Sequence, residues 1–91
     1  MTKIVSSAIM FSPTDQPDTL IIMTGKRHAD IREHIHNLKI DYDRIHSIEG
    51  FMTSTDRFVD RYEAKRIAVE ACQLIVSIAD TYAELYSEDV W

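Results

Sequence analysis

Cysteine is almost absent from this chain, which has only Cys72 and therefore cannot form an intramolecular disulfide. A reducing compartment is the simplest setting for such a protein, and we expect it to act in the cytoplasm. The apolar N-terminal stretch ends at Pro13 without a small-residue cleavage site, so we expect no signal peptide. No apolar run approaches the length of a membrane-spanning helix, and we expect no membrane partner.

Cationic residues are also scarce, with 10 lysines and arginines against 15 aspartates and glutamates and a net charge of -5. Binding DNA or RNA regardless of sequence requires a broad cationic surface, so we expect no nucleic-acid partner. The segment from Gly50 to Arg66 departs from this balance, because it gathers Arg57, Arg61, Lys65 and Arg66. A local concentration of cations in an acidic protein favours an anionic ligand over a solvated surface.

The length of 91 residues predicts a single ligand-binding domain, 1–91, with a modest core. Hydrophobic residues make up 45% of the chain, which is too many for a disordered protein. A small domain with this apolar content often completes its burial at a subunit interface. Homo-oligomerisation is therefore one of our expectations.

The first half of the chain predicts two strands and a helix. Lys3–Phe11 and Thr19–Thr24 are rich in β-branched and apolar residues and flank a proline-containing turn, so they predict a hairpin. The continuous apolar run of the second strand predicts burial on both faces and a central place in the sheet. Asp30 is the predicted N-cap of the helix, with Glu33 three residues later as in a capping box.

The second half repeats this order. Ile48–Thr53 and Arg57–Val59 predict a second hairpin, and Asp60 is the predicted cap of the last helix. The apolar face of that helix runs from Ala64 to Ile78 and includes Cys72 as a small core residue. The fold class is therefore α+β, with a small antiparallel sheet of about four strands, two helices on one face and the order ββαββα.

The region after this helix is expected to contain a further helical segment and a tail that packs against protein. The sequence VSIADTYAE, Val76 to Glu84, has a helical pattern. Ala83 to Trp91 contains Leu85, Val90 and Trp91, whose apolar side chains gain from being removed from water. We expect this tail to dock on its own domain or on a neighbouring subunit.

The basic turn after the second strand is the first candidate site. Lys26, Arg27 and His28 follow Gly25, which allows backbone N–H groups to face a phosphate, and arginine can bind phosphate with two hydrogen bonds. A solvated turn between a strand and a helix explains the same residues. With only two glycines in the chain, a Walker loop and a dinucleotide fingerprint are excluded.

Phe51 is the second candidate. Alternation along the strand places Phe51 on one face and Gly50 and Met52 on the other. If the helices cover the face of Gly50, Phe51 points outward and can stack on a base beside Arg61. A position at an interface or a sheet edge is the alternative.

Signs of catalysis are few. His34 and His36 are two residues apart and point to different helix faces, and Cys72 has no partner cysteine at ligand spacing, so we expect no metal. No serine stands in a nucleophile elbow. We therefore expect neither an enzyme nor a cofactor.

Several short motifs suggest a family. TGKRH after an apolar strand, EGF at the start of a hairpin, FVDRYEAKRIA across the last strand and helix, and the final LYSEDVW resemble the phage-encoded Thoeris anti-defence sponge proteins of the first described type. The likeness runs from about Thr19 to Trp91. It implies a non-enzymatic protein that traps cyclic ADP-ribose isomers in the cytoplasm of an infected bacterium, with cyclic oligonucleotides as further ligands. It also implies a homo-oligomer, a dimer or a hexamer, with nucleotide pockets between protomers.

The resemblance also implies a set of site residues, carried over where the motifs match: Arg27, His28, Phe51, Asp60, Arg61, Ser87 and Glu88. From their chemistry we expect Phe51 to stack on the base and Arg27 and Arg61 to bind the pyrophosphate. Lys26 and Lys65 complete the predicted ligand-binding set. Two alternatives remain: a phage inhibitor that binds a host protein through its outward sheet face or acidic tail, and a small hydrolase acting on the same ligands.

Overall fold

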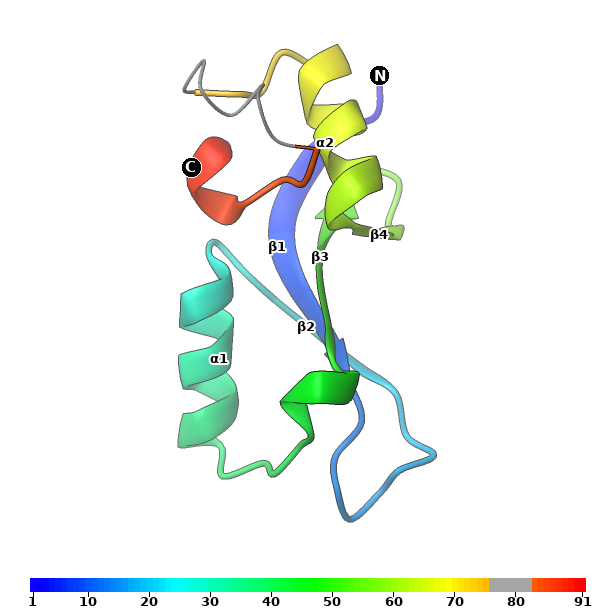
Figure 1. Ribbon diagram of the computed structural model, residues 1–91, viewed down its shortest axis with the longest axis vertical. Helices are drawn as coiled ribbons and strands as arrows, with labels where there is room; N and C mark the ends of the chain where they lie inside the picture. The colour runs from blue at the N-terminus through cyan, green and yellow to red at the C-terminus, as the bar shows by residue number, and fades with distance from the viewer. Residues whose placement is uncertain (76–82) are drawn as a thin grey trace.

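The computed structural model describes residues 1–75 and 83–91. The described part confirms the predicted α+β class and the order ββαββα (Figure 1). Its antiparallel sheet contains β1 (Ile4–Phe11), β2 (Ile21–Gly25), β3 (Ile48–Thr53) and β4 (Phe58–Asp60). The helices are α1 (His28–Asn37) and α2 (Arg61–Glu70), and the short 3-10 helices η1 (Arg44–His46) and η3 (Ser87–Asp89) lie before β3 and near the end of the chain.

The strand order is β2-β1-β3-β4, so both predicted hairpins are present. β2 lies at an edge of the sheet, and the prediction of a central strand was wrong. Burial alternates along β2, with Ile21 and Met23 partly buried and Ile22 exposed. The apolar run was misleading because the outer face of this sheet is itself apolar, so continuous hydrophobicity does not require cover on both faces.

Both helices pack on the inner face of the sheet and divide the core into two clusters. Around α1, Ile9 and Phe11 of β1 meet Ile31 and Ile35 of the helix. Around α2, the cluster consists of Ile4, Phe51, Val59, Ala64, Ile67, Ala68, Leu85 and Val90. The boundary between the clusters leaves room for polar side chains between the two helices.

The start of α2 is as predicted, and the start of α1 is not. The Asp60 carboxylate accepts a hydrogen bond from the Glu63 backbone N–H at 2.8 Å, which fixes the first turn of α2. α1 begins three residues earlier than predicted, with Arg27 at the N-cap position in place of Asp30 and with no side-chain cap. Asp30 lies inside the first turn, where its charge favours the helix dipole instead of capping the end.

The end of α2 also differs from the prediction. The helix stops at Glu70, and Cys72 is exposed with a left-handed backbone at φ 57°. Gln73 explains the stop, because its side-chain amide forms two hydrogen bonds with the backbone of Ile4, at 2.7 and 2.8 Å. This link to β1 draws the chain off the helix axis. The prediction of Cys72 as a core residue was therefore wrong, and most of the predicted helix Val76–Glu84 lies outside the described residues.

The C-terminal segment docks on its own domain, which is one of the two positions expected for it, the other being a neighbouring subunit. Leu85 and Val90 are buried in the cluster around α2, and Trp91 packs against it. The Leu85 N–H donates to the carbonyl of Arg61 at 2.9 Å. Among the described residues, no helix combines the length and the apolar character that crossing a membrane requires.

Candidate functional site

A small polar cleft lies where α1, β3, α2 and the C-terminal segment meet. Figure 1 shows η3, in red, next to the N-terminal end of α1, with β3 to the right of both. The cleft has a volume of about 120 Å³ and is lined by His28, Ala29, Arg32, Glu49, Arg61, Tyr86, Ser87 and Glu88. It brings together chain segments that are far apart in the sequence.

Local structure explains why these side chains converge. His28 and Arg32 are one turn apart in α1 and therefore lie on the same side of the helix. Arg61 is the first residue of α2, which the Asp60 cap holds in place. Glu49 lies two residues before Phe51 in β3 and so projects from the same inner face of the sheet.

The Glu49 carboxylate is the centre of the cleft, because it joins both arginines. Its two oxygens accept hydrogen bonds from Arg32 Nη1 at 2.5 Å and from Arg61 Nη2 at 2.7 Å. The side chains are partly shielded, with exposed fractions of 33% for Arg32, 25% for Glu49 and 16% for Arg61. Burial opposes ionisation of Glu49, but the hydrogen bonds and positive charges of the two arginines outweigh it and lower the pKa of this carboxyl.

Arg61 is held more firmly than Arg32. Its Nη1 donates to the carbonyl of Leu85 at 2.7 Å, and its guanidinium lies over the Tyr86 ring at 4.8 Å from the centroid. Arg61 thus links the start of α2 to the C-terminal segment. It fixes one wall of the cleft as well as supplying charge to it.

His28 lies at the base of the cleft and is buried. Its Nε2 donates to the Gly50 carbonyl at 2.7 Å, and its ring meets the edge of Phe51 at 4.9 Å between centroids. Desolvation by burial lowers the pKa of His28, although the Gly50 hydrogen bond opposes the shift in part. This geometry gives His28 a structural role between α1 and β3.

Four of the predicted site residues line the cleft: His28, Arg61, Ser87 and Glu88. Ser87 is buried and Glu88 is exposed. Arg27 is next to His28 in the chain but is exposed, and its Nη2 donates to the carbonyl of Trp91 at 2.9 Å. The Lys26 side chain is exposed, and its carbonyl accepts a hydrogen bond from Ser7.

The remaining predicted residues lie elsewhere. Asp60 serves as the cap of α2 and lines a separate surface hollow with Tyr62, Glu63 and Arg66. Lys65 is buried, and its Nζ has no hydrogen-bond partner among residues 1–75 and 83–91. Neither side chain is part of the cleft lining.

The predicted outward orientation of Phe51 was wrong, because Phe51 is fully buried under α2 and the C-terminal segment. The helices cover the sheet face that carries Phe51. On the opposite face, the Phe58 ring covers Gly50. A methyl group at Gly50 would come within 2.7 Å of the Phe58 ring. In this structure, Phe51 therefore offers no open ring face for stacking on a base.

Three lining residues, Arg32, Glu49 and Tyr86, were not predicted from the sequence. Arg32 follows His28 by one helical turn, and this spacing could have added it to the basic turn. Glu49 lies on the same face of its strand as Phe51, and a carboxylate on a face that is buried needs a cationic partner. Tyr86 carried no comparable signal. Within the described residues, no group of three or more His, Cys, Asp or Glu side chains could hold a metal ion.

Comparison with known proteins gives one result. The family model described as the phage T4 y16D protein matches residues 3–91, whereas none of the curated proteins or solved structures compared with the chain matches it. The match does not specifically link the chain to the Thoeris sponges. Since it spans nearly the whole sequence, the chain belongs to the phage T4 y16D protein family.

Proposed function

We propose that this phage protein is a non-enzymatic sponge that traps a cyclic nucleotide immune signal, such as a cyclic ADP-ribose isomer, in the cytoplasm of an infected bacterium. A phosphate group of the ligand occupies the polar cleft. The proposal rests on one observation, that the guanidinium groups of Arg32 and Arg61 converge on the two carboxylate oxygens of Glu49. Guanidinium groups match the geometry of phosphate as well as that of carboxylate.

Arg61 is held in a fixed orientation before any ligand binds. Arg61 is already held by the Leu85 carbonyl and the Tyr86 ring, so little side-chain freedom is lost when it binds. Ser87 adds a hydroxyl group to the lining. The N-terminal end of α1 also faces this region, and its positive dipole end favours negative charge.

Glu49 is the competitor of the ligand in this scheme. Its carboxylate now satisfies both guanidinium groups, so a phosphate must either displace it from one arginine or bind on the open side of the pair. A free phosphate ion therefore binds weakly. A whole nucleotide binds more tightly because its other groups contribute contacts outside the cleft.

The size of the cleft limits what it can enclose. A volume of about 120 Å³ accommodates a phosphate group, whereas pockets that enclose whole small molecules measure roughly 300–1,000 Å³. The rest of the nucleotide would lie across the surface beside Arg27 and Glu88. A neighbouring protomer in a homo-oligomer would then cover it, as the resemblance to the sponges implies.

Capture without turnover is the property to test. We expect native mass spectrometry to show the protein bound to at least one member of a panel of cyclic ADP-ribose isomers and cyclic dinucleotides. After denaturation of the complex, the ligand should be recovered intact. Recovery of a hydrolysed product would replace the sponge by an enzyme, and a failure to bind any member of the panel would refute the proposal.

A further inference from the structure

A groove lies at one end of the sheet, next to Met10 and Ile48 of its outer face. The end of β1, the loop after it, η1 and the start of β3 form this groove, which has a volume of about 430 Å³. Most of its lining is apolar, from Met10, Phe11, Pro13, Pro17, Leu20 and Ile48. This volume and composition are typical of sites for small molecules, which measure roughly 300–1,000 Å³.

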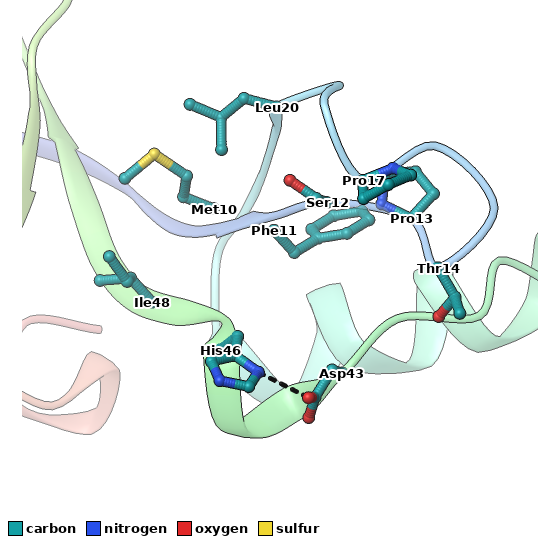
Figure 2. A pocket seen from close by; sticks show the side chains of 10 residues that line it. All are labelled: Met10, Phe11, Ser12, Pro13, Thr14, Pro17, Leu20, Asp43, His46 and Ile48. Carbon is teal, nitrogen blue, oxygen red and sulfur yellow. Dashed lines mark hydrogen bonds and ion pairs between the residues drawn. The ribbon is translucent and has the colours of Figure 1, made fainter.

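The polar groups of the groove include a fixed carboxylate. Figure 2 shows Asp43 and His46 across the hollow from Leu20. One Asp43 oxygen accepts a hydrogen bond from His46 Nδ1 at 2.6 Å, and the other accepts one from the Ile45 backbone N–H at 3.0 Å. Each oxygen has two acceptor positions, so the carboxylate can accept a further hydrogen bond from a bound cation.

Asp43 gives the groove a negative charge. The hydrogen bonds from His46 and from the Ile45 N–H lower the pKa of this carboxyl, so it is ionised at neutral pH. No lysine or arginine lies among the described residues of the lining. His46 is the other titratable side chain there, and its Nδ1 is already bonded to Asp43. The charge that the groove offers to a ligand is therefore that of the Asp43 carboxylate.

The segments around the groove are also acidic. Residues 12–20 and 39–46 contain four aspartates against two cations, Lys39 and Arg44. Both cations line separate hollows. The local potential therefore favours a cationic ligand. It disfavours a second nucleotide, and it disfavours a second copy of the chain, which would bring the same carboxylates to the contact.

We propose that the groove binds a small organic cation, in which an apolar ring contacts Leu20 and Ile48 and a protonated amine binds the Asp43 carboxylate. Leu20 and Ile48 are 64% and 47% exposed, so a ring placed against them removes apolar surface from water. The ammonium group binds at the exposed Asp43, where it keeps part of its hydration. The phenethylammonium ion is a small molecule with this composition.

This site is independent of the proposed nucleotide cleft. The groove and the cleft share no lining residue, and Ile48 and Glu49 point to opposite faces of β3. A cation in the groove therefore leaves Arg32 and Arg61 accessible to a phosphate. The failure of either proposal leaves the other intact.

Three probes with the same ring test the chemistry of the groove: phenethylamine, phenethyl alcohol and phenylpropionate, which are cationic, neutral and anionic at neutral pH. Each is titrated into the wild-type protein while NMR follows the methyl groups of Met10, Leu20 and Ile48, with Met23 on the inner face as the internal control. We expect phenethylamine to shift the groove methyl groups with a Kd of about 1–10 mM, as suits so small a probe. It should bind about threefold more tightly than the alcohol, and the acid should bind more weakly than either, as expected for an exposed ion pair.

Two variants locate the charge that the amine binds. Asp43→Asn removes the charge but keeps an oxygen that can accept the Ile45 N–H hydrogen bond. In this variant, phenethylamine should bind no more tightly than the alcohol. Asp41→Asn is the matched control and should keep the preference, because Asp41 is also exposed and carries the same charge but lies outside the groove lining. Circular dichroism checks that both variants are folded.

Several results would overturn the proposed site. They are equal affinity of the wild type for the three probes, no shift of the groove methyl groups at up to about 20 mM phenethylamine, or a preference for the amine that survives in Asp43→Asn. An equal loss of the preference in Asp43→Asn and Asp41→Asn would also overturn it. The comparison of the probes on the wild type needs no substitution, so it decides the question if Asp43→Asn does not fold.

Discussion

Replacement of Glu49 by glutamine distinguishes two roles of the Glu49 ion pairs. In one role Glu49 competes with a bound phosphate for Arg32 and Arg61, and in the other it only holds the two arginines in place. Glutamine has nearly the same shape as glutamate, but it removes the charge that now neutralises Arg32 and Arg61. Its amide oxygen can still accept from one guanidinium, whereas its NH₂ group faces the other without a favourable contact. The variant therefore removes the competitor of the proposed phosphate while the cleft keeps its shape.

The expected loss of stability follows from the geometry. A hydrogen bond to a charged group contributes about 1.5–3 kcal/mol, and Glu49→Gln weakens two of them. Solvent screens part of this energy because Glu49 is 25% exposed and Arg32 33% exposed. We therefore expect the free energy of unfolding to fall by about 1–3 kcal/mol, which urea denaturation can measure.

The expected gain in binding comes from removing a negative charge near the phosphate. Two unit charges about 4 Å apart interact by about 4 kcal/mol in a partly shielded protein site. A phosphate bound on the open side of the arginines is farther from Glu49, and we expect a gain of about 1.4–2.7 kcal/mol, or about 10- to 100-fold in Kd. Isothermal titration with the cyclic nucleotide that the wild type binds, at two salt concentrations, measures this gain.

Glu33→Gln is the control for this experiment, since it changes the net charge equally but lies on an exposed part of α1 outside the cleft. We expect it to change Kd less than about twofold once salt screens long-range effects. A Glu49→Gln variant with lower stability and an unchanged Kd would refute the role of Glu49 as a competitor of the phosphate. In that case, Glu49 and the arginines serve only to hold α1, β3 and α2 together.

Three further predictions concern buried residues. Burial lowers the pKa of His28 below its ordinary 6.5, so the unfolded state takes up a proton first and the free energy of unfolding should fall as pH drops below about 6.5, by at most about 1.4 kcal/mol per pH unit. Urea denaturation at several pH values should show a smaller loss of stability for His28→Gln over this range, and equal losses in the two proteins would contradict the lowered pKa. Lys65→Met should raise the free energy of unfolding by about 1–3 kcal/mol, because it replaces a buried ammonium group that has no partner among the described residues; a decrease would show that Nζ is paired. Phe51→Ala should lower it by about 3–5 kcal/mol through the cavity left beside Val59 and Leu85, whereas a change below about 1 kcal/mol in thermal or urea unfolding would contradict its place in the core.

Local signals predicted much of the fold correctly. Asp60 caps α2 because its carboxylate needs only the N–H of a residue three positions later, and this relation is visible in the sequence. The turn at Ser54, Thr55 and Asp56 lies between two short apolar segments and forms the predicted hairpin. The apolar tail docks on the domain because its large side chains gain from burial wherever an apolar surface is near.

The errors arose where distant parts of the chain decide the outcome. Alternation in β3 divides Gly50 from Phe51 but does not tell which face the helices cover. The end of α2 depends on hydrogen bonds from Gln73 to Ile4, which is 69 residues away. The bridge from Glu49 to both arginines likewise requires β3, α1 and α2 to be in place, so the sequence predicted the positive charge of the site but not its internal counter-charge.

A nucleotide phosphate that binds at Arg32 and Arg61 must lose affinity when either guanidinium is removed. The most direct test is isothermal titration of the wild type, Arg32→Gln and Arg44→Gln with cyclic ADP-ribose isomers. Arg32 makes its ion pair at the rim of the cleft, and Arg44 is an exposed arginine in η1 outside the cleft lining. We expect equal binding by the wild type and Arg44→Gln, with Kd at least about 10-fold higher for Arg32→Gln. Equal affinity of all three proteins for the isomer, or no binding by the wild type, would contradict it.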